Sequence, residues 1–154
     1  MLRVRQFDAA DAEALSRVYR RSVEGLGASD YAPDQIAAWA GLAPSAERLI
    51  DLMADGRLRL VALDQDRPVG FIDVERDGHI HFLYRAPDAP RGAADALYVQ
   101  AESWSRAQGL QRLFAEASEA AKRFFLRHGF SVVSRRDFEV SGVPIHNYAV
   151  EKRL

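Results

Sequence analysis

The apolar residues of the first third of the chain follow the spacing of a short strand and then of a helix. Residues 2–7 alternate in polarity, which is the period of a strand. Asp8 follows as a helix N-cap, with Asp11 three residues later as in a capping box. The helix carries one apolar stripe, formed by Leu15, Val18, Tyr19 and Val23. We expect it to run to about residue 23 and to end at Gly25 and Gly27.

The rest of the chain alternates between predicted helices and strands. Two helices open at Pro33 and Ser45, both residues that suit a first turn. Turn signals then separate three strands, expected at 58–62, 68–74 and 79–85. The remaining elements are a helix over 92–108, a strand over 110–117, a helix over 119–128 capped by Ser118, and a hairpin of 130–140 with 143–151. No internal repeat or low-complexity stretch interrupts this order, so residues 1–154 are predicted to form a single α+β domain.

Composition narrows the classes of protein that this chain can be. A length of 154 residues, with 48% hydrophobic and 28% charged residues, is typical of a globular protein with a substantial core. The net charge of -1 argues against a nucleic-acid partner. The longest apolar run, residues 36–43, is too short to cross a membrane, and the charged start lacks the apolar core of a signal peptide. We therefore expect a cytoplasmic protein without membrane contact, and the preference for Arg over Lys is typical of a GC-rich bacterial genome.

The absence of cysteine restricts the chemistry further. It excludes disulfides, thiolate nucleophiles and cysteine-ligated zinc. No Ser-centred nucleophile elbow is visible, and no set of His, Asp and Glu has the spacing of metal ligands, so no metal is expected. Any group transfer is therefore expected to proceed by direct attack of one substrate on another.

The segment from strand 78–85 to helix 92–108 has the character of an anion-binding site. The first turn of a helix presents unpaired N–H groups and the positive end of the helix dipole. Gly92, Ala93 and Ala94 lack bulk there, so an anion could approach closely, and Arg91 adds a cation. The alternative is a plain strand-to-helix turn.

The order of elements resembles the GNAT acyltransferase superfamily over nearly the whole chain. The resemblance is carried by "HIHFLYRAPDAPRGAADALY" (79–98), by "LFAEASEAAKRFFLRHGF" (113–130) and by the tail "SGVPIHNYAVEKRL". It implies the acyl-CoA N-acyltransferase fold, a mixed and mostly antiparallel central sheet of about six to seven strands flanked by helices. It also implies acetyl-CoA as co-substrate, bound in a gap between strands 79–85 and 111–117. The resemblance is compatible with a homodimer.

The same resemblance implies roles for individual residues. Backbone groups of Leu83, Tyr84 and Arg85 are expected to bind the pantetheine arm and the thioester. Ser118 stands where many relatives have an Asn that contacts this arm. The expected pyrophosphate ligands are the backbone N–H groups of Arg91, Gly92, Ala93, Ala94 and Asp95.

Three features depart from the family pattern. The loop before Gly92 is one residue short and lacks the Gln or Arg of the motif's first position. Asp95 brings a negative charge to the phosphate site. Phe125 stands where many relatives have a Tyr that protonates the leaving thiolate.

Acetyl transfer to an amine requires a general base and an N–H donor for the thioester oxygen. The favoured bases are His79 and His81, which share one strand face and titrate near neutral pH; the alternative is that both face solvent. Asp73 and Glu75 on the neighbouring strand, or Glu116 acting through water, compete for the role, with surface or structural charge as their alternative. Tyr84 is the first candidate acid, although it shares a face with Ile80 and Phe82, and Tyr148 and Tyr31 are others. A bulged strand end at 83–85 is the expected N–H donor.

The acceptor is expected to bind around residues 22–39. This region holds Ser22, Glu24, Tyr31, Asp34 and Trp39, an aromatic and acidic mixture that would suit a small amine. His146 is a further candidate for this pocket, with an exposed strand position as its alternative. The sequence thus predicts an N-acetyltransferase that moves an acetyl group from acetyl-CoA to a small-molecule or peptide amine. The alternative is a non-catalytic acyl-CoA-binding or regulatory module of the same fold.

Overall fold

Seven strands form two antiparallel sheets in the computed structural model, which describes all 154 residues. The first sheet has the order β1 (Leu2–Gln6), β2 (Leu58–Asp64), β3 (Arg67–Val74) and β4 (Ile80–Arg85). The second has the order β5 (Arg112–Ala117), β7 (Val143–Arg153) and β6 (Ser131–Val140). This confirms the predicted α+β class with about six to seven mostly antiparallel strands, which are divided here between two sheets.

Five helices cover these sheets: α1 (Ala12–Leu26), α2 (Pro33–Ala40), α3 (Ala46–Leu52), α4 (Ala93–Ala107) and α5 (Glu119–Arg127). Residues of α1, α2 and α3 pack on one face of the first sheet and form one core with Val61, Phe71 and Phe82. On the other face of the first sheet lies α4, while α5 packs on the second sheet, and the two helices share a second core that joins both sheets. None of the helices combines the length and apolar character that crossing a membrane requires.

The end of α1 differs from the prediction. Gly25 lies inside the helix, and Gly27 is the C-cap. The reason is a close tertiary contact, since a Cβ on Gly25 would lie 2.5 Å from the Pro87 ring. Gly25 therefore lets the β4–α4 loop approach the helix and does not end it.

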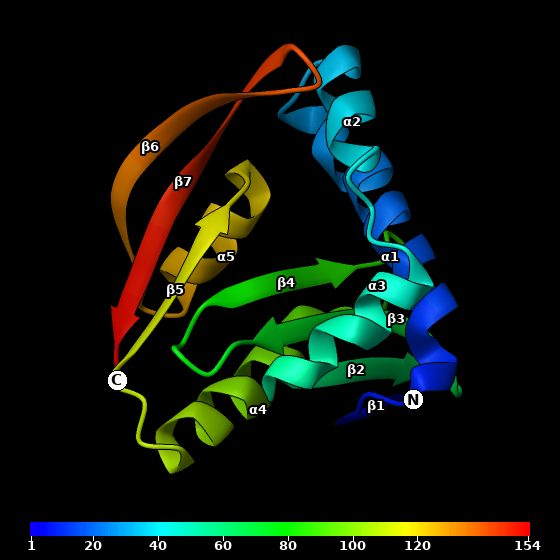
Figure 1. Cartoon of the computed structure of the whole chain (residues 1–154), viewed down its shortest axis with the longest axis vertical. Helices are drawn as coiled ribbons and strands as arrows, with labels where there is room; N and C mark the ends of the chain where they lie inside the picture. Colours follow the sequence, from blue (N-terminus) through cyan, green and yellow to red (C-terminus); the bar gives the residue numbers. More distant parts are fainter.

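The two sheets meet at one point and then separate. A single parallel bridge pairs His79 with Phe114, whose N–H donates to the carbonyl of Gly78 at 3.1 Å. Only glycine fits at residue 78, because its φ is +96° and a Cβ would lie 2.1 Å from the carbonyl oxygen of Arg112. Beyond this bridge β4 and β5 diverge into a V (Figure 1). The tip of the β6–β7 hairpin reaches α2, where Gln35 donates to the carbonyl of Pro144 at 3.0 Å.

Candidate active site

A cavity of about 640 Å³ opens between the two sheets. Its lining includes side chains of α1 and α2, the diverging strands β4 and β5, the helix α5, and the inner face of the β6–β7 hairpin. Of the predicted site residues, His81, Leu83, Tyr84, Arg85, Ala94 and Ser118 line it.

The edge of β4 that faces the V carries unpaired backbone groups. Opposed residues of an antiparallel pair alternate between exchanging hydrogen bonds and leaving their groups turned outward. Ala86 donates to Val69, so the register puts the groups of Tyr84 in the sheet and turns those of Leu83 and Arg85 toward the V. Leu83 and Arg85 can therefore bind an extended chain, whereas the contribution of Tyr84 is its side chain.

The strand irregularity lies at a different residue from the one expected. A bulge was expected at residues 83–85, but the register shifts between the Asp73–Phe82 and Val74–Ile80 pairs, so His81 is the extra residue. This bulge also separates the side chains of Ile80 and Phe82, which were expected to share a face. Ile80 packs into the core under α4, and Phe82 into the core under α1.

The edge of β5 presents a matching set of groups on the other side of the V. Leu154 donates to Gln111, and the register then turns the backbone groups of Phe114 and Glu116 toward the V. Ser118 is the N-cap of α5, and its hydroxyl accepts from the N–H of Ala121 at 3.2 Å. Its own O–H remains available as a donor to a ligand in the cavity.

The start of α4 forms an open cradle for an anion. Gly92 has a φ of +88°, and a Cβ there would meet no atom within 4 Å. The N–H of Ala93 donates to Pro90, while those of Arg91, Gly92, Ala94 and Asp95 have no partner in the protein. Despite the shortened loop, four N–H groups are thus free at the positive end of a helix of 15 residues.

The negative charge of Asp95 is matched by a residue from α5. The Nε2 atom of His128, which caps the end of α5, lies 2.7 Å from the Asp95 carboxylate. This contact ties the two helices that flank the cradle. It also gives a partner to the carboxylate whose negative charge departs from the family pattern, while the backbone N–H of Asp95 remains free.

His79 is held between two carboxylates. Its Nδ1 lies 2.5 Å from Glu75, and its Nε2 lies 2.8 Å from Glu116 on β5. The hydrogen bond to Glu116 is the main cause that raises the pKa of His79 to about 9, with a further contribution from Glu75. At neutral pH both ring nitrogens therefore carry protons, and His79 offers no lone pair to a substrate.

His81, beside it, has the opposite protonation state. Arg57 Nη1 lies 2.8 Å from His81 Nδ1, and because a guanidinium only donates, Nδ1 must accept. Burial, followed by the charge of Arg57, lowers the pKa of His81. A neutral His81 thus carries its proton on Nε2, which has no partner in the protein. The hydrogen bonding of both histidines argues against the base roles predicted from the sequence.

Tyr84, the predicted acid, is partly buried and lines the cavity, whereas Phe125 is buried. The ring of Tyr84 lies 4.3 Å from that of Tyr19, and burial raises the pKa of Tyr84 well above its usual value. Phe125 is 2% exposed and packs against Phe130.

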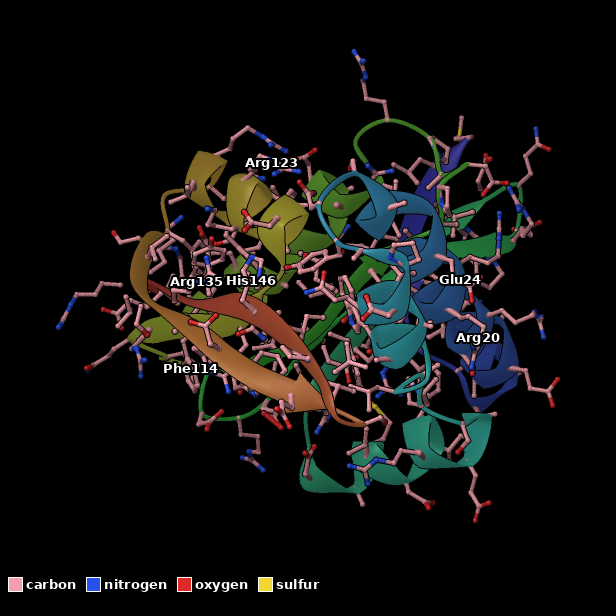
Figure 2. All side chains as sticks on the ribbon, turned by 90° about the horizontal axis from the view of Figure 1, so that it is seen from above. Arg20, Glu24, Phe114, Arg123, Arg135 and His146 are labelled. Carbon is pink, nitrogen blue, oxygen red and sulfur yellow. The ribbon has the colours of Figure 1, made fainter.

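The acceptor end of the cavity is partly as predicted. Ser22, Tyr31 and Trp39 line it. Glu24 does not; it lies 3.7 Å from Arg20, and Figure 2 shows both on the outer side of α1. Asp34 is also absent from the lining. The acidic residue of this region that does line the cavity is Asp30, which pairs with Arg123 at 2.9 Å.

Several lining residues were missed because they come from the β6–β7 hairpin, which carries no recognisable motif. They are Arg136, Phe138, Val140, Ile145 and Asn147. Alternation along β6 was the available signal, since it places Arg136, Phe138 and Val140 on one face. His146 also borders the cavity, and its Nε2 lies 2.6 Å from Glu119. Hydrogen bonds from His146 and Tyr148 outweigh burial and lower the pKa of Glu119 to about 2.

Comparison with known proteins identifies this arrangement. Residues 27–152 match the family model described as "Acetyltransferase (GNAT) domain". The chain is 30% identical over 151 residues to the uncharacterized N-acetyltransferase YafP of Escherichia coli, covering 96% of this chain and 93% of YafP. It is 27% identical to the peptidyl-lysine N-acetyltransferase YjaB of Salmonella typhimurium, covering 94% of this chain and 93% of YjaB.

Solved structures agree with the family match. A GCN5-related N-acetyltransferase from Rhodopseudomonas palustris superposes with a TM-score of 0.90 at 30% identity, over 99% of this chain and 95% of that one. The PaiA N-acetyltransferase of Thermoplasma acidophilum, solved with coenzyme A, shares the fold with a TM-score of 0.79 at 21% identity, over 100% and 99% of the two chains. By the family model and by these relatives, this chain belongs to the GNAT family of acetyltransferases.

Proposed function

We propose that residues 1–154 form one N-acetyltransferase domain that transfers an acetyl group from acetyl-CoA to an amine within a ternary complex. The observation that carries this proposal is the V itself. One open strand edge, at Leu83 and Arg85, leads to four free N–H groups at the start of α4. An extended amide-containing arm with a pyrophosphate at one end matches this sequence of groups.

Each part of the co-substrate has a set of partners in this arrangement. The backbone groups of Leu83 and Arg85 would pair with the amides of the pantetheine arm, and the Ser118 hydroxyl would donate to it. The pyrophosphate would lie at Gly92, where no side chain obstructs an anion. Acetyl-CoA supplies the activated acetyl group when bound.

For proton transfer we propose Glu116 as the acceptor, acting through water. Its carboxylate lines the cavity, and its hydrogen bond from His79 lowers its pKa and keeps it ionised. His81 would act as a donor through Nε2–H, toward the oxygen that becomes negative during attack. Tyr84 stays the predicted source of a proton for the leaving thiolate because it lines the cavity beside Leu83 and Arg85, although burial raises its pKa and makes its hydroxyl a weaker acid.

The test is to measure acetyl-CoA binding and turnover on the purified chain separately. We expect millimolar acetyl-CoA to raise the thermal unfolding midpoint, because a ligand that binds only the folded state stabilises it. We also expect an amine panel to release free thiol from acetyl-CoA. Stabilisation without thiol release from any amine would favour the non-catalytic module, for which the buried Phe125 is the structural argument. No stabilisation would refute both forms of the proposal.

A further inference from the structure

Arg136 is a cation without a carboxylate partner on the acceptor wall of the cavity. Its Nη1 donates to Asn147 Oδ1 at 3.0 Å, and its guanidinium lies over Phe138, 5.4 Å from the ring centroid. No acidic group lies within salt-bridge distance of it. The adjacent Arg135, in contrast, pairs with Asp137 at 3.1 Å. Because residues alternate along a strand, Arg135 lies on the opposite face, outside the cavity.

Arg136 and Glu116 lie on the same face of the second sheet. Arg136 is opposite Asn147, Glu116 is opposite Ala149, and these two β7 residues are two positions apart. Two strand spacings and a two-residue offset separate their Cα atoms by about 12 Å. Both side chains reach into this interval, which leaves room for a compact molecule with opposite charges a few ångströms apart.

The rest of this wall is apolar. Phe138, Val140 and Ile145 continue the same sheet face, and Trp39 and Leu42 line the cavity from the side of α2. Leu42 is 55% exposed and Trp39 is partly exposed, so both have surface to bury against a ligand.

We propose that the acceptor is a zwitterionic amine, an α-amino acid with an apolar side chain. This inference rests on the proposed function and names the substrate class of the same site. The acceptor's ammonium group would lie toward Glu116, and its carboxylate would form a two-pronged contact with Arg136. Its side chain would pack between Phe138 and Trp39.

The reaction then balances as follows. The ammonium loses one proton to Glu116 through water, and the neutral nitrogen attacks the thioester carbon. The C–N bond forms and the C–S bond breaks. The leaving thiolate takes a proton from Tyr84, and the second nitrogen proton replaces it on Tyr84. The products are an N-acetyl amino acid and free CoA thiol. The proton on Glu116 passes to solvent.

The first test compares each amino acid with its decarboxylated counterpart. The probes are L-leucine against isoamylamine and L-phenylalanine against phenethylamine. L-Leucinamide serves as an analogue of leucine in which an uncharged amide replaces the carboxylate. We expect kcat/KM to be about 10- to 100-fold higher for the acids, the range for a charge-assisted hydrogen bond. Equal or better turnover of the decarboxylated amines would overturn the inference and leave the proposed function standing.

The second test uses a matched pair of variants. Arg136→Gln is expected to remove the preference for the carboxylate, mainly by raising KM for leucine, with little effect on isoamylamine. Arg135→Gln, one residue away and outside the cavity, should keep the preference. An equal loss of kcat/KM for leucine and for isoamylamine in Arg136→Gln would overturn the inference. Thiol release with a lysine peptide but with none of the amino acids would also overturn the inference. Failure of acetyl-CoA to stabilise the protein would refute the proposed function itself.

Discussion

Neighbours on other strands give His79 and His81 opposite protonation states. The two rings lie side by side, with centroids 5.8 Å apart. His79 meets two carboxylates and becomes a cation, whereas His81 meets a guanidinium and stays neutral. The alternation of polar residues was sufficient to bring them together on one strand. It could not assign their roles, because Arg57, just before β2, and Glu116, on β5, are far from them along the chain.

Gly92 is the residue whose substitution most directly tests the phosphate cradle. Gly92→Glu should abolish the thermal shift produced by acetyl-CoA, because it places bulk and negative charge at the four N–H groups. The control is Gly109→Glu beyond the other end of α4. Gly109 also has a positive φ, +78°, and open space around it, so both variants carry a similar backbone strain. An acetyl-CoA shift that survives in Gly92→Glu would place the pyrophosphate elsewhere.

At the scale of elements, β2 and β3 are held together by charges in the interior. Arg59 contacts both oxygens of Asp73, at 2.6 and 2.7 Å, and donates to the carbonyl of Leu49 in α3 at 2.6 Å. Sequence reasoning gave surface charge as the alternative role of Asp73, but its side chain is fully buried. The reason is that α3 covers this face of the sheet, and a strand pattern does not reveal which helix will pack on it.

Breaking this buried pair should lower the free energy of unfolding much more than breaking an exposed pair. We expect Arg59→Ala to lower the free energy of unfolding by about 3–5 kcal/mol, since it leaves Asp73 charged and buried without its main partner. Arg3→Ala, which removes an exposed pair with Asp66, should change it by less than about 1 kcal/mol. Chemical denaturation of both variants measures the difference, and equal effects would contradict the assignment.

At the scale of the whole molecule, His79 joins the two sheets at the vertex of the V. Its backbone forms the only bridge between them, and its side chain links Glu75, just beyond the end of β3, to Glu116 on β5. The opening between β4 and β5, and therefore the space for an acyl-CoA arm, depends on this junction. Gly78 contributes by allowing the backbones to approach.

The stability that His79 provides should depend on pH. Its pKa is about 9 in the folded protein, against 6.5 for an unperturbed histidine. The folded state therefore binds the proton more tightly. This contribution is complete below pH 6.5 and is lost as the pH rises through about 9. Comparing His79→Gln with the parent, we expect a clear difference in thermal midpoint at pH 6 and little difference at pH 10. A pH-independent difference would show that packing, and not the charge, is responsible.

Local sequence was enough to establish the order of strands and helices, the caps at Asp8, Ser45 and Ser118, and the strand–loop–helix unit that forms the cradle. These features depend on interactions between residues a few positions apart. Three-dimensional contacts were needed for the protonation of the histidines, the bulge at His81 and the acceptor wall with Arg136. Each of these arises where residues far apart in the chain meet, because a side chain's charge and access to substrate depend on the groups that fold against it.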